Sequence, residues 1–142
     1  MELKNTSGQI LFTSTKARTM GELVQEAAQL SMDLSFADLS NSDLRNTKVG
    51  EFKPLRMANA NLRGANLSMA ILPQGDFSGA NLALANLYGA KFPGANFSKA
   101  NLTGANVNKA DFSSANLENA TLLGVDLNGC NLASARLDGV KK

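Results

Sequence analysis

Residues 60–104 read ANLRGANLSMAILPQGDFSGANLALANLYGAKFPGANFSKANLTG. In this stretch alanine, then asparagine, then leucine or phenylalanine return every five residues. An α-helix repeats its faces about every 3.6 residues and a β-strand every two, so this period belongs to neither. A unit this short cannot bury its apolar side chains alone, whereas stacked copies bury a continuous core. The sequence therefore predicts a solenoid.

Each repeat is described by five positions. The large apolar residue is the centre, preceded by the polar position and, before that, the small position; the two residues after the centre are the turn positions. The small position holds a small residue in 18 of 21 repeats, and the polar position holds Asn or Asp in 15. The frame is unbroken over 50–139, and three upstream centres keep the spacing in another phase, which indicates an insertion at about 47–49. The centres are Leu34, Leu39, Leu44, Phe52, Met57, Leu62, Leu67, Leu72, Phe77, Leu82, Leu87, Phe92, Phe97, Leu102, Val107, Phe112, Leu117, Leu122, Leu127, Leu132 and Leu137.

The A-(N/D)-L-x-x motif resembles that of the pentapeptide-repeat family over residues 32–139. The resemblance implies an all-β solenoid, a right-handed quadrilateral β-helix with one repeat on each of four sides and the centres packed in the middle. Twenty-one repeats then make about five turns, a rod about 25 Å long at the usual interstrand spacing. Small residues leave room for tight corners, where Asn or Asp can bond the local backbone.

Four sides place residues twenty apart in one column. The centre phenylalanines then fall in two adjacent columns, where rings from successive turns can stack with an offset. The two columns are Phe52, Leu72, Phe92, Phe112, Leu132 and Met57, Phe77, Phe97, Leu117, Leu137.

Residues 1–31 do not repeat and are predicted to cap the solenoid, whose ends otherwise expose the core. Residues 2–4 and 9–13 flank a turn-rich stretch at 5–8, which is typical of a β-hairpin.

A short helix is predicted over about 20–30. Thr19 and Glu22 fit a capping box in which Thr19 is the N-cap and Glu22 reaches back to it. Leu23, Ala27 and Leu30 share one helical face, which we expect to lie over the first turn of the solenoid.

The opposite end has only the tail 140–142 after the last repeat. Leu132, Leu137 and Val140 are therefore expected to be under-protected. Either the chain folds back locally or another subunit covers this end, and a homodimer joined end to end is one hypothesis.

The residue types argue against an enzyme, a cofactor or a metal site. The chain has no histidine, the commonest general base and metal ligand. Cys130 occupies a small position and is expected to replace alanine in the core rather than act as a nucleophile. Asp33, Asp38 and Asp43 are five residues apart, so they belong on different sides and cannot converge on a metal ion.

Composition suggests a soluble cytoplasmic protein. The net charge is +2, which implies neither a strongly acidic nor a strongly basic partner. A single cysteine fits a reducing compartment, and neither a membrane span nor a signal peptide is recognisable. The resemblance extends to bacterial and phage proteins with a similar hairpin-and-helix front end.

The best-known activity in the family is DNA mimicry, in which acidic rods bind type II topoisomerases and protect them from quinolones. Duplex DNA carries one negative charge per about 1.7 Å, so a rod of about 25 Å would need about 15. Residues 50–142 hold six acidic and nine basic side chains, the wrong sign for a mimic. The basic residues are scattered and lack aromatic platforms, so nucleic-acid binding is not predicted either.

The remaining candidates are apolar side chains expected to face outward. Leu84 and Tyr88 can form a contact patch on adjacent sides, although isolated surface apolar residues are also normal. The sequence thus predicts a non-enzymatic, rigid structural or protein-interaction module with an unknown partner. The alternative function is that of a DNA-mimic-like binder and protector of a type II topoisomerase or another nucleic-acid enzyme. The candidate surface residues are Met69, Ile71, Leu84, Tyr88 and Leu123.

Overall fold

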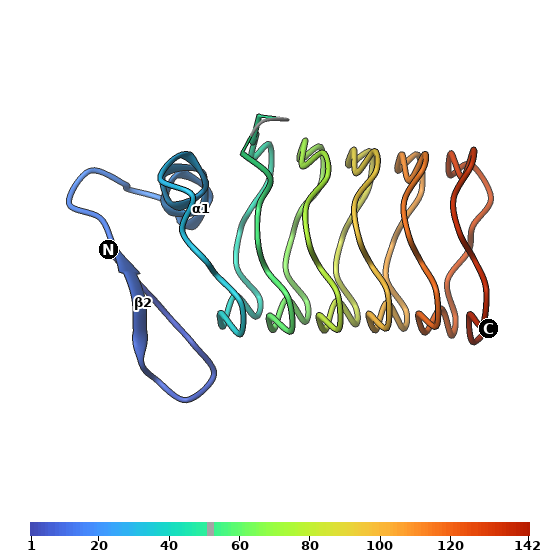
Figure 1. Ribbon diagram of the computed structural model, residues 1–142, viewed down its shortest axis with the longest axis horizontal. Coiled ribbons are helices and arrows are strands. Elements are labelled where there is room, and N and C mark those ends of the chain that lie inside the picture. Colours follow the sequence, from blue (N-terminus) through green and yellow to red (C-terminus); the bar gives the residue numbers. More distant parts are fainter. Residues whose placement is uncertain (51–52) are drawn as a thin grey trace.

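The computed structural model describes residues 1–50 and 53–142. The chain begins with an antiparallel hairpin of β1 (Glu2–Lys4) and β2 (Ile10–Thr13), which is followed by helix α1 (Met20–Gln29). It then winds in stacked circuits to the C-terminus (Figure 1). We call one circuit a coil. Of the described residues, none forms a helix with the length and apolar character needed to cross a membrane.

Each repeat turns a corner through four residues. After Leu62, the N–H of Ala65 donates to the Leu62 carbonyl at 3.0 Å, and the intervening Gly64 has a φ of 66°. A positive φ at the third of four residues is typical of a type II turn, which favours proline at the second. Pro73 and Pro93 occupy that second position. The period of five is thus one type II turn plus a short extended side.

The Asn or Asp at the polar position bonds the backbone of its own turn. Oδ1 of Asp76 accepts the N–H of Ser78 at 3.0 Å, and Oδ1 of Asn96 accepts that of Ser98 at 3.1 Å. These side chains also connect coils, since Asn96 Nδ2 donates to Asp76 Oδ1 at 3.2 Å. The predicted bonding of Asn and Asp to local backbone is confirmed.

Backbone bonds set a register of twenty residues between coils. The N–H of Leu62 donates to the Asn81 carbonyl at 2.7 Å, and the N–H of Asn81 donates to the Ala60 carbonyl at 2.9 Å. Parallel bridges of this kind recur along the chain as far as Thr121 paired with Lys141. One coil therefore holds four repeats on four sides, as predicted.

The first coil is offset from the second by 23 residues. Asp33 pairs with Arg56, and Lys48 pairs with Ile71, in the same parallel manner as the later bridges. The three additional residues therefore lie between Lys48 and Arg56.

Val49 is the fourth centre of the first coil, so the insertion expected at 47–49 is misplaced. Val49 is buried, and its N–H donates to the Ile71 carbonyl at 3.0 Å. Thr47 is also buried and takes the small position before it. Val49 thus holds the place in the column that was predicted for Phe52, and Phe52 itself lies outside the described residues.

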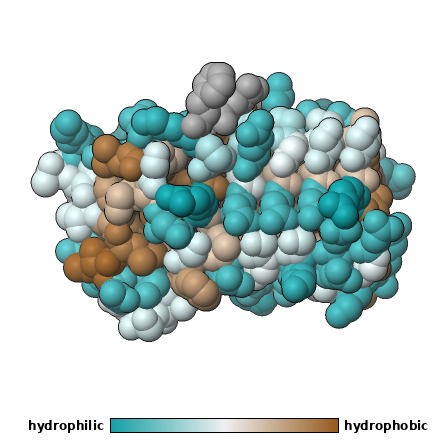
Figure 2. Space-filling view, viewed as in Figure 1, coloured by the Kyte–Doolittle hydropathy of each residue, from teal (hydrophilic) through white to brown (hydrophobic). Residues whose placement is uncertain are grey.

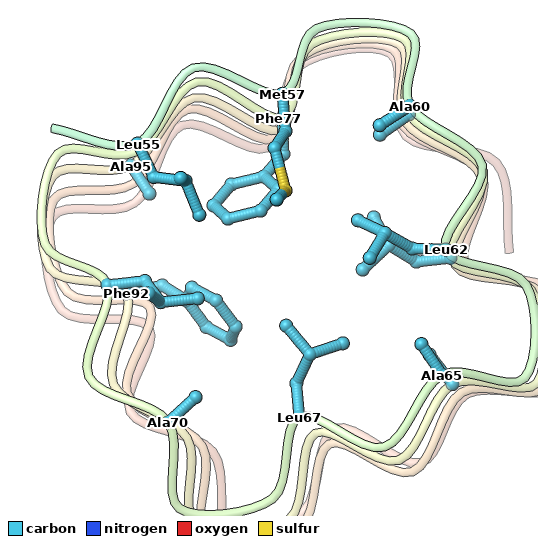
Figure 3. Packing of buried hydrophobic residues seen from close by; sticks show 14 of the residues in the cluster. Leu55, Met57, Ala60, Leu62, Ala65, Leu67, Ala70, Phe77, Phe92 and Ala95 are labelled. Carbon is cyan, nitrogen blue, oxygen red and sulfur yellow. The ribbon is translucent and has the colours of Figure 1, made fainter. Parts of the chain in front are cut away.

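The centres fill the middle of the coils (Figure 3). Phe77 stacks on Phe97 with ring centroids 4.9 Å apart and planes inclined by 8°, and Phe92 stacks on Phe112 at 5.4 Å and 18°. Adjacent columns meet edge to face, as Phe77 and Phe92 do at 5.6 Å and 84°. The predicted ring stacking is confirmed, and such pairs contribute about 0.5–1.5 kcal/mol each beyond their burial.

One large residue at a small position is matched by a glycine in the next coil. Leu55 is buried, and the N–H of Asp76 still donates to its carbonyl at 2.8 Å. Gly75 follows in the same column, and a Cβ there would lie 2.6 Å from Cε2 of Phe77. The missing side chain therefore makes room for the ring.

The hairpin continues the ladder of the coils at their N-terminal end. Asn5, just after β1, pairs antiparallel with Ala37 of the first coil, and the N–H of Asp38 donates to the Lys4 carbonyl at 2.8 Å. The predicted hairpin is confirmed, and β1 lies between β2 and the first coil.

Helix α1 starts where it was predicted, with Oγ1 of Thr19 accepting the N–H of Glu22 at 3.1 Å. The carboxylate of Glu22 accepts the N–H of Arg18 at 2.7 Å, one residue before the N–H expected in the capping box. Leu30, expected on the apolar face, is the C-cap residue and is 61% exposed, because the helix has ended before it. The buried face consists of Gly21, Leu23, Val24, Ala27 and Ala28.

Two cations from the insertion region bind the C-terminal end of α1. Lys53 Nζ donates to the carbonyl of Gln29, and the guanidinium of Arg56 donates to the carbonyl of Ser31 at 2.7 Å. Positive charge is favourable beside the free carbonyls of a helix C-terminus. These contacts attach the helix to the second coil.

Gly75→Ala is expected to destabilise the protein by about 1–3 kcal/mol, because the added methyl group overlaps the Phe77 ring in a filled core. The midpoint of urea unfolding, followed by circular dichroism, measures the change. Adding Phe77→Leu should recover part of the loss, since leucine lacks the ring atom that the methyl group meets. An unchanged midpoint for Gly75→Ala would contradict the packing described here.

Candidate interaction surfaces

Two exposed leucines lie along one corner of the rod, within type II turns. Leu84 is 57% exposed and Leu123 is 47% exposed. Cδ2 of Leu84 lies 2.9 Å from the position of a Cβ on Gly104, one coil further on. The N–H of Gly104 donates to the Leu123 carbonyl at 2.8 Å. Leu84 and Leu123 therefore flank Gly104 and form one apolar strip.

The next corner carries Met69 and Tyr88, which are 53% and 37% exposed. The sulfur of Met69 lies 2.6 Å from the position of a Cβ on Gly89, so Met69 covers the residue after Tyr88. Lys109 Nζ lies 5.3 Å from the centroid of the Tyr88 ring, within the range of a cation–π contact. Sequence reasoning missed Lys109, although the twenty-residue register places it one coil beyond Gly89.

The five predicted surface residues do not form one contiguous group. Ile71 is half-buried on a side, where it pairs with Lys48 of one neighbouring coil and Lys91 of the other. Leu84 and Tyr88 lie in consecutive turns, at the two ends of the side formed by 85–87. A contact patch that uses both of them stays a prediction.

The N-terminal region presents apolar side chains that sequence reasoning did not select. Ile10 and Phe36 are both half exposed. Figure 2 shows apolar surface gathered over the hairpin and helix end of the rod, whereas the visible side of the coils is mainly hydrophilic. Alternation in β2 and the outward turn position of Phe36 were the available signals.

The last coil leaves one end of the core half-covered. In earlier coils the N–H of a centre and the carbonyl of a small residue usually bond the following coil, as at Leu62 and Ala60. Among the described residues, the N–H groups of Leu132 and Leu137 and the carbonyls of Cys130 and Ala135 have no backbone partner. The half-buried apolar side chains here are Val125, Leu127, Cys130, Leu132, Ala135, Leu137 and Val140.

One side of this last coil has left the ladder. Asn131 donates its N–H to the Ala110 carbonyl at 2.9 Å, but within the described part of the chain Asp126 makes no equivalent bond to Ala105. Val125 occupies the small position here and has alanine beneath it, whereas Leu55 has glycine beyond it. A branched side chain above Ala105 needs more room than alanine does. We call residues 125–129 the detached side.

The acidic side chains of the first coil are bound locally rather than gathered. Asp33, Asp38 and Asp43 pair with three different sides of the second coil. Arg45 donates to both carboxylate oxygens of Asp43, at 2.9 and 2.7 Å, and this hydrogen bonding lowers the pKa of Asp43 to about 2. The described residues contain no group of three side chains suited to a metal ion.

Cys130 is the chain's only thiol. Its Sγ donates to the Val107 carbonyl at 2.9 Å, and burial raises the pKa of the thiol. A raised pKa favours the protonated form, which is a poor nucleophile. The thiol therefore acts here as a hydrogen-bond donor within the packed end of the coil.

The chain belongs to the pentapeptide-repeat family. The family model, described as pentapeptide repeats in eight copies, matches residues 60–98, 80–119 and 110–141, more than half of the chain. The fold is thus a right-handed β-helix solenoid. Among curated protein sequences, the chain has no match.

Solved pentapeptide-repeat structures are similar to parts of the chain. Rfr23 from the cyanobacterium Cyanothece 51142 is 41% identical over 57% of this chain and 58% of its own, with a TM-score of 0.38. AT2G44920 from the Arabidopsis thaliana thylakoid lumen is 26% identical over 80% and 64%, with a TM-score of 0.43. QnrB1, a plasmid-mediated fluoroquinolone resistance protein, is 21% identical over 69% and 57%, with a TM-score of 0.34. The chain spans less than two thirds of each of these proteins.

Proposed function

We propose that this protein is a rigid, non-enzymatic interaction module that binds another protein in the cytoplasm. The ladder of backbone bonds between coils, which among the described residues is interrupted at the detached side, carries the proposal, because it holds the outward side chains at fixed spacing on a rigid rod. Preorganised surfaces lose little conformational entropy on binding. The titratable side chains are solvated or paired locally, which supports a binding role over catalysis.

The hairpin and α1 act, in this proposal, as a cap on a rod of about five turns. The hairpin edge bonds the first coil through Asn5 and Ala37, and the buried face of α1 joins the same core cluster as Leu34. Covering this end shields the apolar side chains of the first coil, which an uncapped solenoid would expose.

The two apolar corners supply the surface for a protein partner. Leu84 and Leu123 form one strip; Met69 and Tyr88 form the other, with Lys109 beside it. Aromatic and methionine side chains are enriched at protein interfaces, and the lysine favours a partner with negative charge nearby.

The last coil is suited to a second copy of the chain. Its free N–H and carbonyl groups alternate along the sides formed by 130–132 and 135–137, as at Leu132 and Cys130. Two such edges related by a two-fold axis run antiparallel, so each can donate to and accept from the other. The half-buried apolar side chains of both copies would then close one core.

The alternative is binding to a type II topoisomerase or another nucleic-acid enzyme. Family resemblance favours this alternative, but residues 50–142 contain six acidic and nine basic side chains, which opposes mimicry of DNA.

Leu137→Asp is expected to turn a concentration-dependent dimer of the 142-residue chain into a monomer, because a carboxylate would be buried in the joined core. Light scattering coupled to size exclusion measures the mass. Leu123→Asp, on an exposed corner, is the matched control and should leave the dimer intact. A monomeric wild-type chain at high micromolar concentration would rule out the end-to-end dimer.

Leu84→Ser combined with Tyr88→Ser is expected to weaken retention of a protein partner from a bacterial lysate without changing the fold. Quantitative mass spectrometry of captured proteins compares this variant with wild type. Lys99→Ser combined with Asn119→Ser alters another exposed corner and should retain the partner. Equal capture by all three proteins would remove the apolar corners as the binding surface.

DNA supercoiling by gyrase is expected to be unaffected by the protein, with or without a quinolone, because the charge of the rod has the wrong sign for a DNA mimic. An agarose-gel supercoiling assay measures this, with heat-denatured protein as the control. Inhibition of supercoiling, or protection against the quinolone, would favour the alternative function.

A further inference from the structure

Asn128 and Gly129 form the only Asn-Gly pair in the chain. They lie in the turn at the end of the detached side, and Asn128 is exposed. Nothing lies within 4 Å of the position that a Cβ on Gly129 would take. The amide nitrogen of a residue after asparagine can attack the side-chain carbonyl carbon, and glycine obstructs this approach least.

The attacking nitrogen is unbonded in this turn. At the equivalent position of earlier turns, Gly89 and Gly104 donate their N–H to the carbonyl of the next coil, at 2.9 and 2.8 Å. Gly129 has no acceptor among the described residues. Gly129 belongs to the last coil, so within the described chain no following coil offers its N–H an acceptor. A hydrogen bond to a following coil would hold the nitrogen away from the side chain, and this barrier to reaction is absent at Gly129.

The attacked side chain is also less restrained than its counterpart. One coil earlier, Asn108 Nδ2 donates to Asn106 Oδ1 at 3.1 Å. Only the backbone N–H of Asn128 bonds Asp126, at 2.9 Å, and within the described residues the side-chain amide has no hydrogen bond. A hollow of about 380 Å³, lined in part by Asn128 and Lys142, gives water access.

We propose that Asn128 is a deamidation site whose reaction alters the C-terminal coil. Solvent hydroxide removes the proton of the Gly129 amide, and the nitrogen bonds to Cγ of Asn128. The Cγ–Nδ2 bond breaks, ammonia leaves with a proton from water, and a five-membered succinimide remains. Water then opens either ring carbonyl to give aspartate or isoaspartate, so the net change is addition of water and loss of ammonia.

Both products disturb the same turn. Each product adds a negative charge at residue 128, whose backbone N–H donates to Oδ1 of Asp126. Isoaspartate also adds a carbon to the backbone inside the turn that the Cys130 N–H closes on the Leu127 carbonyl at 3.2 Å. We therefore expect the modified chain to lose order at its C-terminal coil while the earlier coils stay intact.

The purified chain is incubated at neutral and mildly alkaline pH. Peptide mapping by mass spectrometry measures the deamidation of each asparagine over time, and labelling by isoaspartyl methyltransferase detects isoaspartate as a second readout. Residue 128 is expected to react first, and faster as hydroxide increases. Val125→Ala should slow the reaction without touching the Asn-Gly pair, because alanine lets the detached side return to the ladder and restrains the Asn128 backbone. The Asn128 carbonyl could then accept from the preceding coil, as the Asn108 carbonyl accepts the Gly89 N–H at 2.9 Å.

Tyr88→Asn is the matched control, since it places asparagine before Gly89, whose N–H is bonded to the ladder. Reaction at that position should be at least about tenfold slower than at 128, equivalent to a local opening free energy of about 1.4 kcal/mol. Equal deamidation rates at positions 88 and 128 would overturn the proposal. The proposal would also fail if Asn128 stayed intact under conditions in which a synthetic peptide of residues 125–131 deamidates.

Discussion

A type II turn closed by a backbone hydrogen bond, and supported in most repeats by an asparagine or aspartate side chain, is the constraint on which the rest of the structure depends. It places a left-handed residue in every repeat whose turn is described, including bulky residues such as Leu84 and Met69, with φ near 60°. This conformation costs roughly 1–2 kcal/mol for a residue other than glycine. The cost is offset because the N–H of that same residue bonds the next coil, as Leu84 does with the Thr103 carbonyl at 2.9 Å. No repeat is therefore stable alone, and stability arises from stacking.

The same constraint explains why departures from the small position matter. The side is short, so the side chain before each centre lies against the neighbouring coil. Leu55 is buried at a small position and stays in the ladder, and Gly75, which follows it in the column, leaves the space that the Phe77 ring occupies. Val125 has no such compensation, and its side of the coil has left the ladder. A substitution at a small position thus acts through the coil beside it more than through its own repeat.

Periodicity predicted the regular part of the fold because one local rule is repeated without change. The columns and the ring stacking followed from a spacing of twenty, and the local bonding of Asn and Asp followed from their preference for turns. Val49 was missed because its repeat reads Thr-Lys-Val, which hides the motif, and because Phe52 offered a more typical centre. Two details of α1 were not predicted: Glu22 accepts the N–H of Arg18, and Leu30 is exposed. Both depend on how α1 packs against the first coil, and a local sequence pattern does not encode that packing. The twenty-residue register could have predicted that Lys109 lies beside Tyr88. The detached side could not be predicted from the register, because it depends on how Val125 packs against the preceding coil.

Function in such a rod must be carried by exceptions to the repeat. The polar positions use their oxygens on their own backbone, as Asn101 does with the Thr103 N–H at 3.0 Å, so little of that chemistry is left for a ligand. The described centres from Leu34 to Leu122 are buried. The side chains at the two turn positions vary freely, because the turns bond the next coil through their backbone. The two ends of the rod also vary, because they lie outside the repeated pattern. The turn positions carry the exposed leucines and the contact between Tyr88 and Lys109. The half-covered last coil is one of the two ends. A partner that recognises this protein must therefore read its corners or its end, since the sides differ little from one coil to the next.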